Sequence, residues 1–246
     1  LGFAPPGWDS LHSGLGGGDA LRELLIKAGM LVKNEDGRVY DRFRDRVMFP
    51  IRDRRGRVIA FGGRVLGDDK PKYLNSPETP VFHKGSELYG LYEARTAIRE
   101  AGFALVTEGY MDVVSLAQAG ITNAVATLGT ACTEQHVQSL FKTATEIIFC
   151  FDGDVAGKKA AWRALELCLP ILDDLHRIKF IILSNAEDPD SFVRKFGAEA
   201  FREQINAAAS LPDFLFNTLA KQADLEHIDG RVQLANQVKQ QLIKLP

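Results

Sequence analysis

EIIFCFDGDVAG, residues 146–157, predicts a buried strand that ends in a pair of carboxylates. The run from Ile147 to Phe151 is β-prone or aromatic, and small and acidic residues follow it at once. That change of composition is typical of a strand that breaks into a turn, and Gly157 frees the backbone before a helix begins. The sequence therefore predicts that Asp152 and Asp154 lie at the exit of a buried strand.

The same alternation of strand and helix continues on both sides of this stretch. Strands are predicted at 103–107, 123–127, 146–151 and 178–183, and helices at 110–118, from about 133, from about 156 to 169 and from about 190. Four such units in a row predict a parallel sheet covered by helices on both faces.

Three regions are expected along the chain. Residues 1–100 form a mixed α+β lobe, with a helix at 19–29 and strands at 47–51 and 58–61 joined by a charged turn. Residues 101–200 hold the α/β sheet, and residues 201–246 form a C-terminal helical subdomain. The predicted fold class is thus α/β and α+β.

Composition excludes several classes of protein. With 46% hydrophobic and 25% charged residues in 246, the chain is expected to be globular. No stretch approaches the roughly 18 apolar residues of a membrane helix, and the N-terminus does not resemble a secretory signal. The three cysteines, Cys132, Cys150 and Cys168, form no C-x-x-C, which disfavours zinc or disulfides and favours a cytoplasmic setting. The missing initial Met suggests a fragment.

Basic residues gather in one part of the chain. From Arg38 to Lys72 eleven basic residues face five acidic ones, a balance of +6 in a chain whose net charge is −2. The bland interpretation is a solvated surface. However, the arginines alternate with strand-forming Val, Phe and Ile, which predicts a row of guanidiniums on one face of a sheet and hence a polyanion-binding surface.

Acidic residues follow three of the four predicted parallel strands. Because ligands bind beyond the carboxyl ends of such strands, carboxylates that are far apart in sequence are expected to converge there. Like charges raise one another's pKa, and hard divalent cations are the usual counter-charge. We therefore expect Mg²⁺ or Mn²⁺ at this edge. The carboxylates are those of Glu108, Asp112, Asp152, Asp154, Glu187, Asp188 and Asp190.

Each signal also has a structural explanation. Asp-Gly-Asp is common in turns, Asp188 and Asp190 could cap a helix, and Glu108 could be a first-turn acid. A calcium loop is excluded, because Ala156 and Arg163 stand where that loop needs oxygen ligands. It is much less expected that all three acidic groups stand at matching strand exits by chance.

These residues resemble a known catalytic domain. The set Glu108-Gly109, Asp152-x-Asp154 and Asp188-x-Asp190 resembles the toprim domain shared by bacterial primases, topoisomerases and some nucleases. RVMFPIRDRRGRVIAFGGR, KYLNSPETPVFHKG, LYGLYEA, EGYMDVVSLAQAG, AVATLGTACT, FDGDVAGKKAAWRAL and EDPDSFVRKFG are similar to the RNA-polymerase domain of the bacterial DnaG-type DNA primase. The resemblance covers nearly the whole chain.

The resemblance also suggests what is missing. The zinc-binding module, the helicase-binding domain and an early part of the polymerase domain are expected to be absent from these residues. One departure is Asn185-Ala186, where the family usually has a glycine-containing turn.

The resemblance implies metal-dependent synthesis of short RNA primers from nucleoside triphosphates on single-stranded DNA. Its catalytic residues would be Glu108, Asp152 and Asp154, and Asp188 and Asp190 would join them as ligands of two or more Mg²⁺ or Mn²⁺ ions, with no zinc. Glu108 is either a ligand or the general base. Asp112 would be a secondary acid, and Gly109 would keep the backbone close to the site.

A basic ridge that carries template, primer and triphosphates is implied in the N-terminal lobe. Gly62-Gly63 suggests a close backbone approach to a ligand. The matching ridge positions are Arg42, Arg44, Arg64, Lys72, Tyr73, Asn75 and Lys84.

The implied partners are the single-stranded DNA template, the RNA primer and nucleoside triphosphates, at the bacterial replication fork in the cytoplasm. The replicative helicase and single-strand binding protein would bind through the absent domains, and no membrane is involved. A second hypothesis is a toprim scaffold that binds or cuts nucleic acid. A topoisomerase would need a nucleophilic tyrosine, and Tyr110 is the nearby candidate.

Overall fold

The computed structural model describes residues 1–15, 17–68, 70–184 and 187–246. Contacts divide the chain into two compact units, Leu1–Tyr92 and Glu93–Pro246, and each unit is described by itself. The division into three regions at residues 100 and 200 stays a prediction. The departure at Asn185-Ala186 lies outside the described residues.

The first unit is built on an antiparallel sheet with the strand order β1-β4-β5-β6. The predicted pair of strands is confirmed, although β5 runs further than expected. The predicted helix ends at Lys27 because Gly29 turns the chain with φ +70. The elements are β1 (Gly2–Ala4), α1 (Ser10–Leu15), α2 (Asp19–Lys27), the hairpin β2 (Leu31–Lys33) and β3 (Val39–Asp41), β4 (Arg46–Arg52), β5 (Val58–Val65) and β6 (Tyr73–Asn75).

The expected row of guanidiniums forms only in part. Arg42 and Arg44 lie between β3 and β4, where Asp45 interrupts the extended backbone with φ 49. Arg46 does lie in β4, but it is buried. Arg64 lies near the end of β5 and pairs with Tyr73 of β6. The alternation does form strands, but the break at Asp45 leaves Arg42 and Arg44 outside them.

The second unit contains a five-stranded sheet with the order β11-β10-β9-β7-β8. The four predicted parallel strands are confirmed, and each is followed by a helix. Its elements are α3 (Leu91–Ala101), β7 (Phe103–Thr107), α4 (Tyr110–Gln118), β8 (Ala124–Ala126), α5 (Glu134–Phe141), β9 (Glu146–Phe151), α6 (Val155–Cys168), the 3-10 turn η1 (Leu169–Ile171), β10 (Arg177–Ile182), α7 (Pro189–Asn206), β11 (Ala209–Ser210), α8 (Leu211–Ala220) and α9 (Ile228–Leu242).

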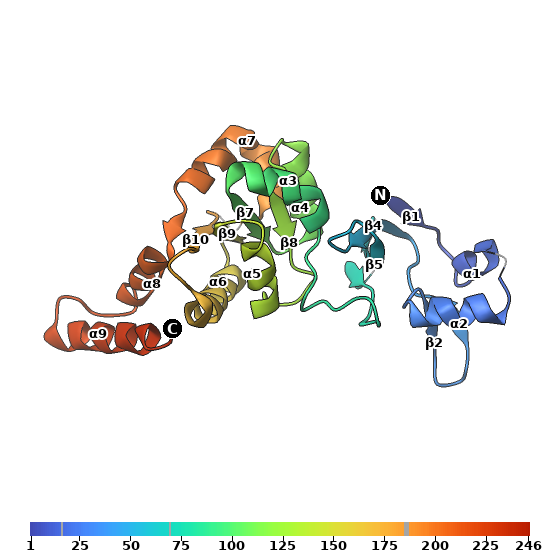
Figure 1. Ribbon diagram of the computed structural model, residues 1–246, viewed down its shortest axis with the longest axis horizontal. Coiled ribbons are helices and arrows are strands. Elements are labelled where there is room, and N and C mark those ends of the chain that lie inside the picture. Colours follow the sequence, from blue (N-terminus) through green and yellow to red (C-terminus); the bar gives the residue numbers. More distant parts are fainter. Residues whose placement is uncertain (16, 69, 185–186) are drawn as a thin grey trace. The chain divides into compact units, whose positions relative to one another are not determined.

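Helices cover both faces of this sheet, as predicted. Helices α4 and α7 lie on one side and α5 and α6 on the other (Figure 1). Strand β11, which was not predicted, pairs antiparallel with β10 at the sheet's edge. It escapes sequence analysis because two residues show no periodicity.

The core explains why these segments fold as they do. Phe149 of β9 is 1% exposed and stacks between Phe151 and Phe180, at centroid distances of 6.0 and 5.7 Å. Aromatic side chains of this kind bury a large area and hold β9 in the middle of the sheet. Thr133 accepts a hydrogen bond from His136 N and so begins α5 as predicted.

Within the described part of the chain, the search for membrane spans finds no helix with the length and apolar character needed to cross a bilayer.

Candidate functional site

Three neighbouring strands deliver the predicted carboxylates to one edge of the sheet. β7 and β10 both pair in parallel with β9, and Phe103 and Arg177 both stand opposite Glu146. The strands therefore start level and end at the same edge, where Glu108 follows β7 and Asp152 follows β9. The loop that begins with Asp152 also touches the loop after β10, because Gly153 N donates to Glu187 O at 3.4 Å.

Two of the aspartates are helix caps. Asp154 Oδ1 accepts a hydrogen bond from Gly157 N at 2.7 Å at the start of α6. Asp188 Oδ1 accepts one from Ser191 N at 2.6 Å at the start of α7. The capping interpretation is thus correct for Asp188, whereas Asp190 lies inside α7 and Asp154 was not expected to cap a helix. Each cap uses one carboxylate oxygen and leaves the second for other contacts.

Asp112 is the most enclosed of the acidic residues. Its two oxygens accept hydrogen bonds from Gly109 N at 3.1 Å and Asp190 N at 3.3 Å, so it joins the loop after β7 to the start of α7. Burial, and then the charges of Asp188 and Asp152, raise its pKa to about 7. The buried Asp112 carboxylate therefore links the loop after β7 to the first turn of α7 by hydrogen bonds.

Glu108 and Asp152 are half-buried carboxylates with raised pKa values. Burial, followed by the charges of Glu108, Asp188 and Asp154, raises the pKa of Asp152 to about 6. Burial and the charge of Asp154 raise the pKa of Glu108. No described residue donates a hydrogen bond to either side chain. Like charges without donors need a counter-charge from elsewhere.

The donor set fits a hard divalent cation. Glu108, Asp152, Asp154 and Asp188 interact electrostatically and offer carboxylate oxygens, which Mg²⁺ and Mn²⁺ prefer. Asp190 differs, because Arg194 Nε lies 2.6 Å from its Oδ1 and Ser115 Oγ also donates to it. Among the described residues, no three His, Cys, Asp or Glu side chains form a group arranged to hold a metal ion. Metal ligation by these residues stays a prediction.

Glu108 borders a pocket of about 320 Å³. The 129–131 loop and α6 form other parts of its lining, which includes Thr127 and Arg163. Arg163 brings a guanidinium to the same pocket as the Glu108 carboxylate. A pocket with both charges can hold a ligand that carries phosphate and a metal ion.

In the first unit, three of the predicted ridge residues lie on β5 and β6, and a fourth, Lys72, directly precedes β6. Arg64 stands opposite Tyr73, and Asn75 stands opposite Gly62. The Arg64 guanidinium and the Lys72 ammonium each lie 5.8 Å from the centroid of the Tyr73 ring. Tyr73 is 43% exposed, so an aromatic face with two adjacent cations is open to solvent.

The other ridge residues have local contacts. The Arg44 guanidinium lies 3.9 Å from the centroid of the Trp8 ring, and it donates to Asp41 O. Burial lowers the pKa of Arg42. Lys84 N donates to Glu78 Oε1 at 3.0 Å. The role of these three residues in binding stays a prediction.

Gly63 has a packing explanation, whereas an added methyl group at Gly109 would make only an ordinary contact. A Cβ at Gly63 would lie 2.9 Å from Phe43 Cδ1 and 3.1 Å from Arg46 Cδ, so β5 needs a glycine there for packing. A Cβ at Gly109 would lie 3.4 Å from Asp112 Oδ2. The structure thus supplies a reason for Gly63 that needs no ligand.

Tyr110 does not suit the topoisomerase hypothesis. It is 4% exposed, whereas a nucleophilic tyrosine must reach a phosphodiester. Sequence analysis missed the close approach at Gly157, whose added Cβ would lie 2.2 Å from Asp152 O, and it missed Ser115, which donates to Asp190. The glycine in DGDVAG was assigned only a turn role, and no motif marks Ser115.

Three family models match the chain in succession. Residues 1–95 match the DNA primase catalytic core, N-terminal domain. Residues 105–193 match a Toprim-like family, and residues 212–246 match the DnaB-helicase binding domain of primase. The expectation that the helicase-binding domain is absent is therefore wrong. That segment consists of short amphipathic helices with no distinctive motif, so sequence analysis classed it only as helical.

Curated and solved relatives are bacterial primases. The chain is 59% identical over 248 residues to the DNA primase of Pseudomonas aeruginosa, covering 100% of this chain and 37% of the relative. It is 58% identical over 235 residues to the DNA primase of Escherichia coli K12, covering 96% of this chain and 40% of the relative. The chain thus spans about two fifths of the length of these relatives.

Solved structures share the fold. The crystal structure of a DNA primase domain from Pseudomonas aeruginosa is similar with a TM-score of 0.95 and 59% identity, over 100% of this chain and 77% of that one. A structure of the DnaG primase catalytic domain bound to ssDNA is similar with a TM-score of 0.91 and 56% identity, over 100% and 79%.

Proposed function

The chain belongs to the DnaG primase catalytic-core family, and we propose that it catalyses template-directed synthesis of short RNA primers from nucleoside triphosphates on single-stranded DNA. The observation that carries this proposal is the convergence of Glu108, Asp152 and Asp154 beyond the ends of two adjacent parallel strands. Raised pKa values at Glu108 and Asp152 support it, because those carboxylates need a cation to remain charged.

In this proposal Glu108, Asp152, Asp154 and Asp188 hold Mg²⁺ or Mn²⁺. When bound, such an ion would stabilise the negative charge that develops on the α-phosphate oxygens during nucleotidyl transfer. Asp190 would be a weaker metal ligand than the other four, because its carboxylate already contacts Arg194 and Ser115. Asp112 would act as a positioning residue, since its oxygens hold Gly109 N and Asp190 N.

Residues of the acidic edge and its pocket can be given roles in nucleotidyl transfer. The 3'-oxygen of one nucleotide attacks the α-phosphorus of the next, and the bond to pyrophosphate breaks. Glu108 would take the 3'-hydroxyl proton or serve as a ligand, and the burial that raises its pKa makes its carboxylate a better proton acceptor. Arg163, in the same pocket, would contact phosphate oxygens.

Template and triphosphates would bind the ridge of the first unit. The exposed Tyr73 ring with Arg64 and Lys72 beside it offers a stacking face and two phosphate contacts. These side chains would contact phosphates and the faces of bases. They would make no contacts to base edges, so they would not select a particular sequence.

The decisive test is primer synthesis by Asp152→Ala. We expect loss of short RNA products with Mg²⁺ or Mn²⁺, while binding to single-stranded DNA stays largely unchanged because Asp152 contributes no positive charge. Glu203→Gln, an exposed acid on α7, is the matched control and should keep full synthesis. Wild-type synthesis by Asp152→Ala would remove Asp152 from the catalytic site. Metal-dependent cutting of the template, without synthesis, would instead support a toprim nuclease.

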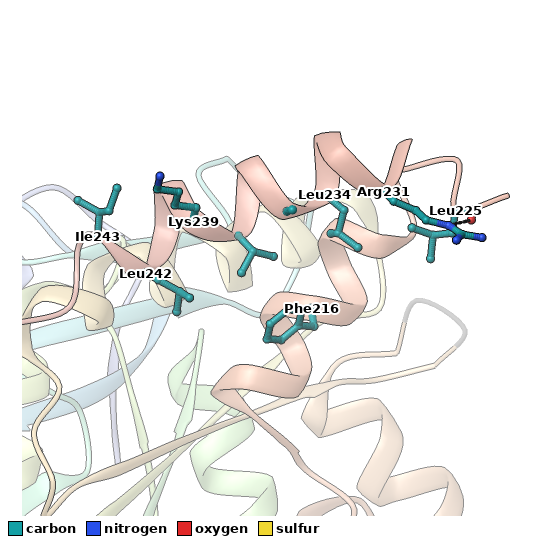
Figure 2. A pocket seen from close by; sticks show the side chains of 9 residues that line it. Phe216, Leu225, Arg231, Leu234, Lys239, Leu242 and Ile243 are labelled. Atoms are coloured by element: carbon teal, nitrogen blue, oxygen red, sulfur yellow. Dashed lines mark hydrogen bonds between the residues drawn. The ribbon is translucent and has the colours of Figure 1, made fainter. Parts of the chain in front are cut away.

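We also propose that residues 212–246 contact the replicative helicase, because the matching family model covers this segment. An apolar groove of about 600 Å³ runs between α8 and α9, with Phe216, Leu234 and Leu242 in its lining (Figure 2). Apolar grooves of this kind accept an amphipathic helix. We further propose that the protein acts at the replication fork in the cytoplasm together with the single-strand binding protein. The acidic edge would bind two or more metal ions.

A pair of isoleucine variants tests the helicase contact. Ile243 lines the groove and is 72% exposed, whereas Ile228 is equally exposed and lies outside it. Ile243→Asp should weaken binding of purified replicative helicase, measured by sedimentation, and Ile228→Asp should not. Equal binding by both variants would move the contact elsewhere.

A further inference from the structure

A second, larger pocket lies in the unit Glu93–Pro246, between helix α6 and helices α8 and α9. Its volume is about 830 Å³. Four basic side chains line it, namely Lys158, Lys159 and Arg163 of α6 and Lys221 at the end of α8. None of its described lining residues is acidic.

These four cations differ from several basic residues of the same unit that pair with carboxylates. Lys179, Arg194, Lys195, Arg202 and Lys244 of the same unit each lie within 4.0 Å of a carboxylate. Among the described residues, the four lining cations form no such pair. Four positive charges around one pocket repel one another, and an anion in the pocket would relieve that repulsion.

The pocket also offers groups that recognise a base. Lys158 and Trp162 lie four residues apart on α6, as do Lys159 and Arg163, so the two pairs form neighbouring rows along the helix. Gln237 Oε1 is buried and accepts no hydrogen bond from the described residues. An aromatic face stacks on any base, and an unpaired buried acceptor gains from a ligand's donor.

This pocket adjoins the one that Glu108 lines, because the two share Arg163. Arg163 lines both pockets, and Ala160, one turn earlier on α6, lines the pocket of Glu108. The walls are held by contacts across the unit, because Lys244 Nζ, just beyond α9, lies 2.9 Å from Glu166 Oε1 on α6. A chain of phosphates that leaves the acidic edge therefore meets a row of cations along α6.

We propose that this pocket binds a segment of single-stranded nucleic acid, with phosphates on Lys158, Lys159, Arg163 and Lys221 and a base stacked on Trp162. The site is separate from the ridge, which lies in residues 1–92. The proposal rests on the proposed function for the kind of ligand, and it adds a place where a strand is held beside the catalytic edge.

Trp162 provides a readout that belongs to this pocket alone. The chain contains two tryptophans, and Trp8 is 62% exposed in the first unit. In a Trp8→Phe background of the full 246-residue chain, an oligothymidylate of roughly 12 nucleotides, within the usual site size, should quench Trp162 fluorescence saturably. Binding at the ridge would leave this signal unchanged.

Charge removal tests the phosphate contacts. In the same background, Lys158→Ala with Lys221→Ala should weaken the quenching at least about tenfold and lower the salt slope of log K by about 1.4, for two lost contacts to a single strand. The matched control, Arg202→Ala with Lys142→Ala, removes the same charge from exposed residues outside the pocket and should keep the wild-type slope. Urea denaturation checks that all variants fold, which is expected because these side chains are exposed.

Three outcomes would overturn the proposal. The first is an unquenched Trp162 while the oligonucleotide binds by fluorescence anisotropy. The second is equal loss in the control pair, which would indicate a general charge effect. The third is quenching by a free nucleoside triphosphate but not by the oligonucleotide, which would make the pocket a nucleotide site. Failure here leaves the Asp152→Ala test untouched, because that test measures synthesis and not binding at α6.

Discussion

Adding one methyl group at Gly157 should disable the acidic edge without touching any carboxylate. Gly157 is buried in the first turn of α6, and its N–H donates to Asp154 Oδ1 at 2.7 Å. An added Cβ would lie 2.2 Å from the carbonyl oxygen of Asp152, 2.9 Å from its carbonyl carbon and 3.0 Å from its nitrogen. All three are backbone atoms, so no side chain can rotate to make room.

The size of the effect follows from these distances. Overpacking of this kind costs about 1–3 kcal/mol, and contact with rigid backbone places Gly157→Ala at the upper end. Alanine returns roughly 1 kcal/mol through its higher helix propensity. We therefore expect a net loss of about 2 kcal/mol in the free energy of unfolding. The backbone of Asp152 must also move by roughly 1 Å, and a shift of that size can lower a catalytic rate about 100-fold.

Two measurements check this expectation. Urea denaturation gives the change in stability, and calorimetric titration with Mn²⁺ gives the change in metal affinity, which should fall with the displacement of Asp152. Gly14→Ala is the control, because its Cβ would meet nothing within 4 Å, and it should be no less stable than wild type. Wild-type Mn²⁺ affinity in a destabilised Gly157→Ala protein would refute the link between this contact and the position of Asp152.

Three further predictions concern charge, binding and packing. The pKa of Asp112, about 7, lies above its ordinary value of 3.8, so the folded state holds this proton more tightly. Stability of the metal-free protein should then fall as pH rises from about 4 to about 7, and Asp112→Asn should reduce that fall in urea denaturation at pH 5 and pH 8; an unchanged pH dependence would contradict it. Arg64→Ala and Lys72→Ala should each weaken binding to single-stranded DNA and lower its salt slope by about 0.7, and a slope equal to wild type in a salt titration would remove that residue from the ridge. Phe149→Ala should cost about 3–5 kcal/mol in unfolding free energy, because the ring is 1% exposed, whereas Phe196→Ala, at a ring 45% exposed, should cost much less.

Short-range patterns were enough to predict most of the second unit. The run 146–151 became β9 as expected, and the acidic residues after it lie at the edge shared with β7 and β10. Parallel strands joined by helices must present their carboxyl ends together, so local order along the chain already implied which carboxylates converge. The motifs of the first unit likewise identified the residues around Tyr73.

Tertiary structure decided what each of these side chains does. Two features depend on the packing of α4 against α7: the hydrogen bond from Ser115 to Asp190, 75 residues apart in sequence, and the burial that raises the pKa of Asp112. The same holds for Lys221, which is brought to the pocket beside α6 only by the fold. The sequence by itself determined the strands, the helices and the acidic edge, because these follow from local periodicity. Side-chain partners and burial depend on contacts between distant segments, and no local pattern encodes them.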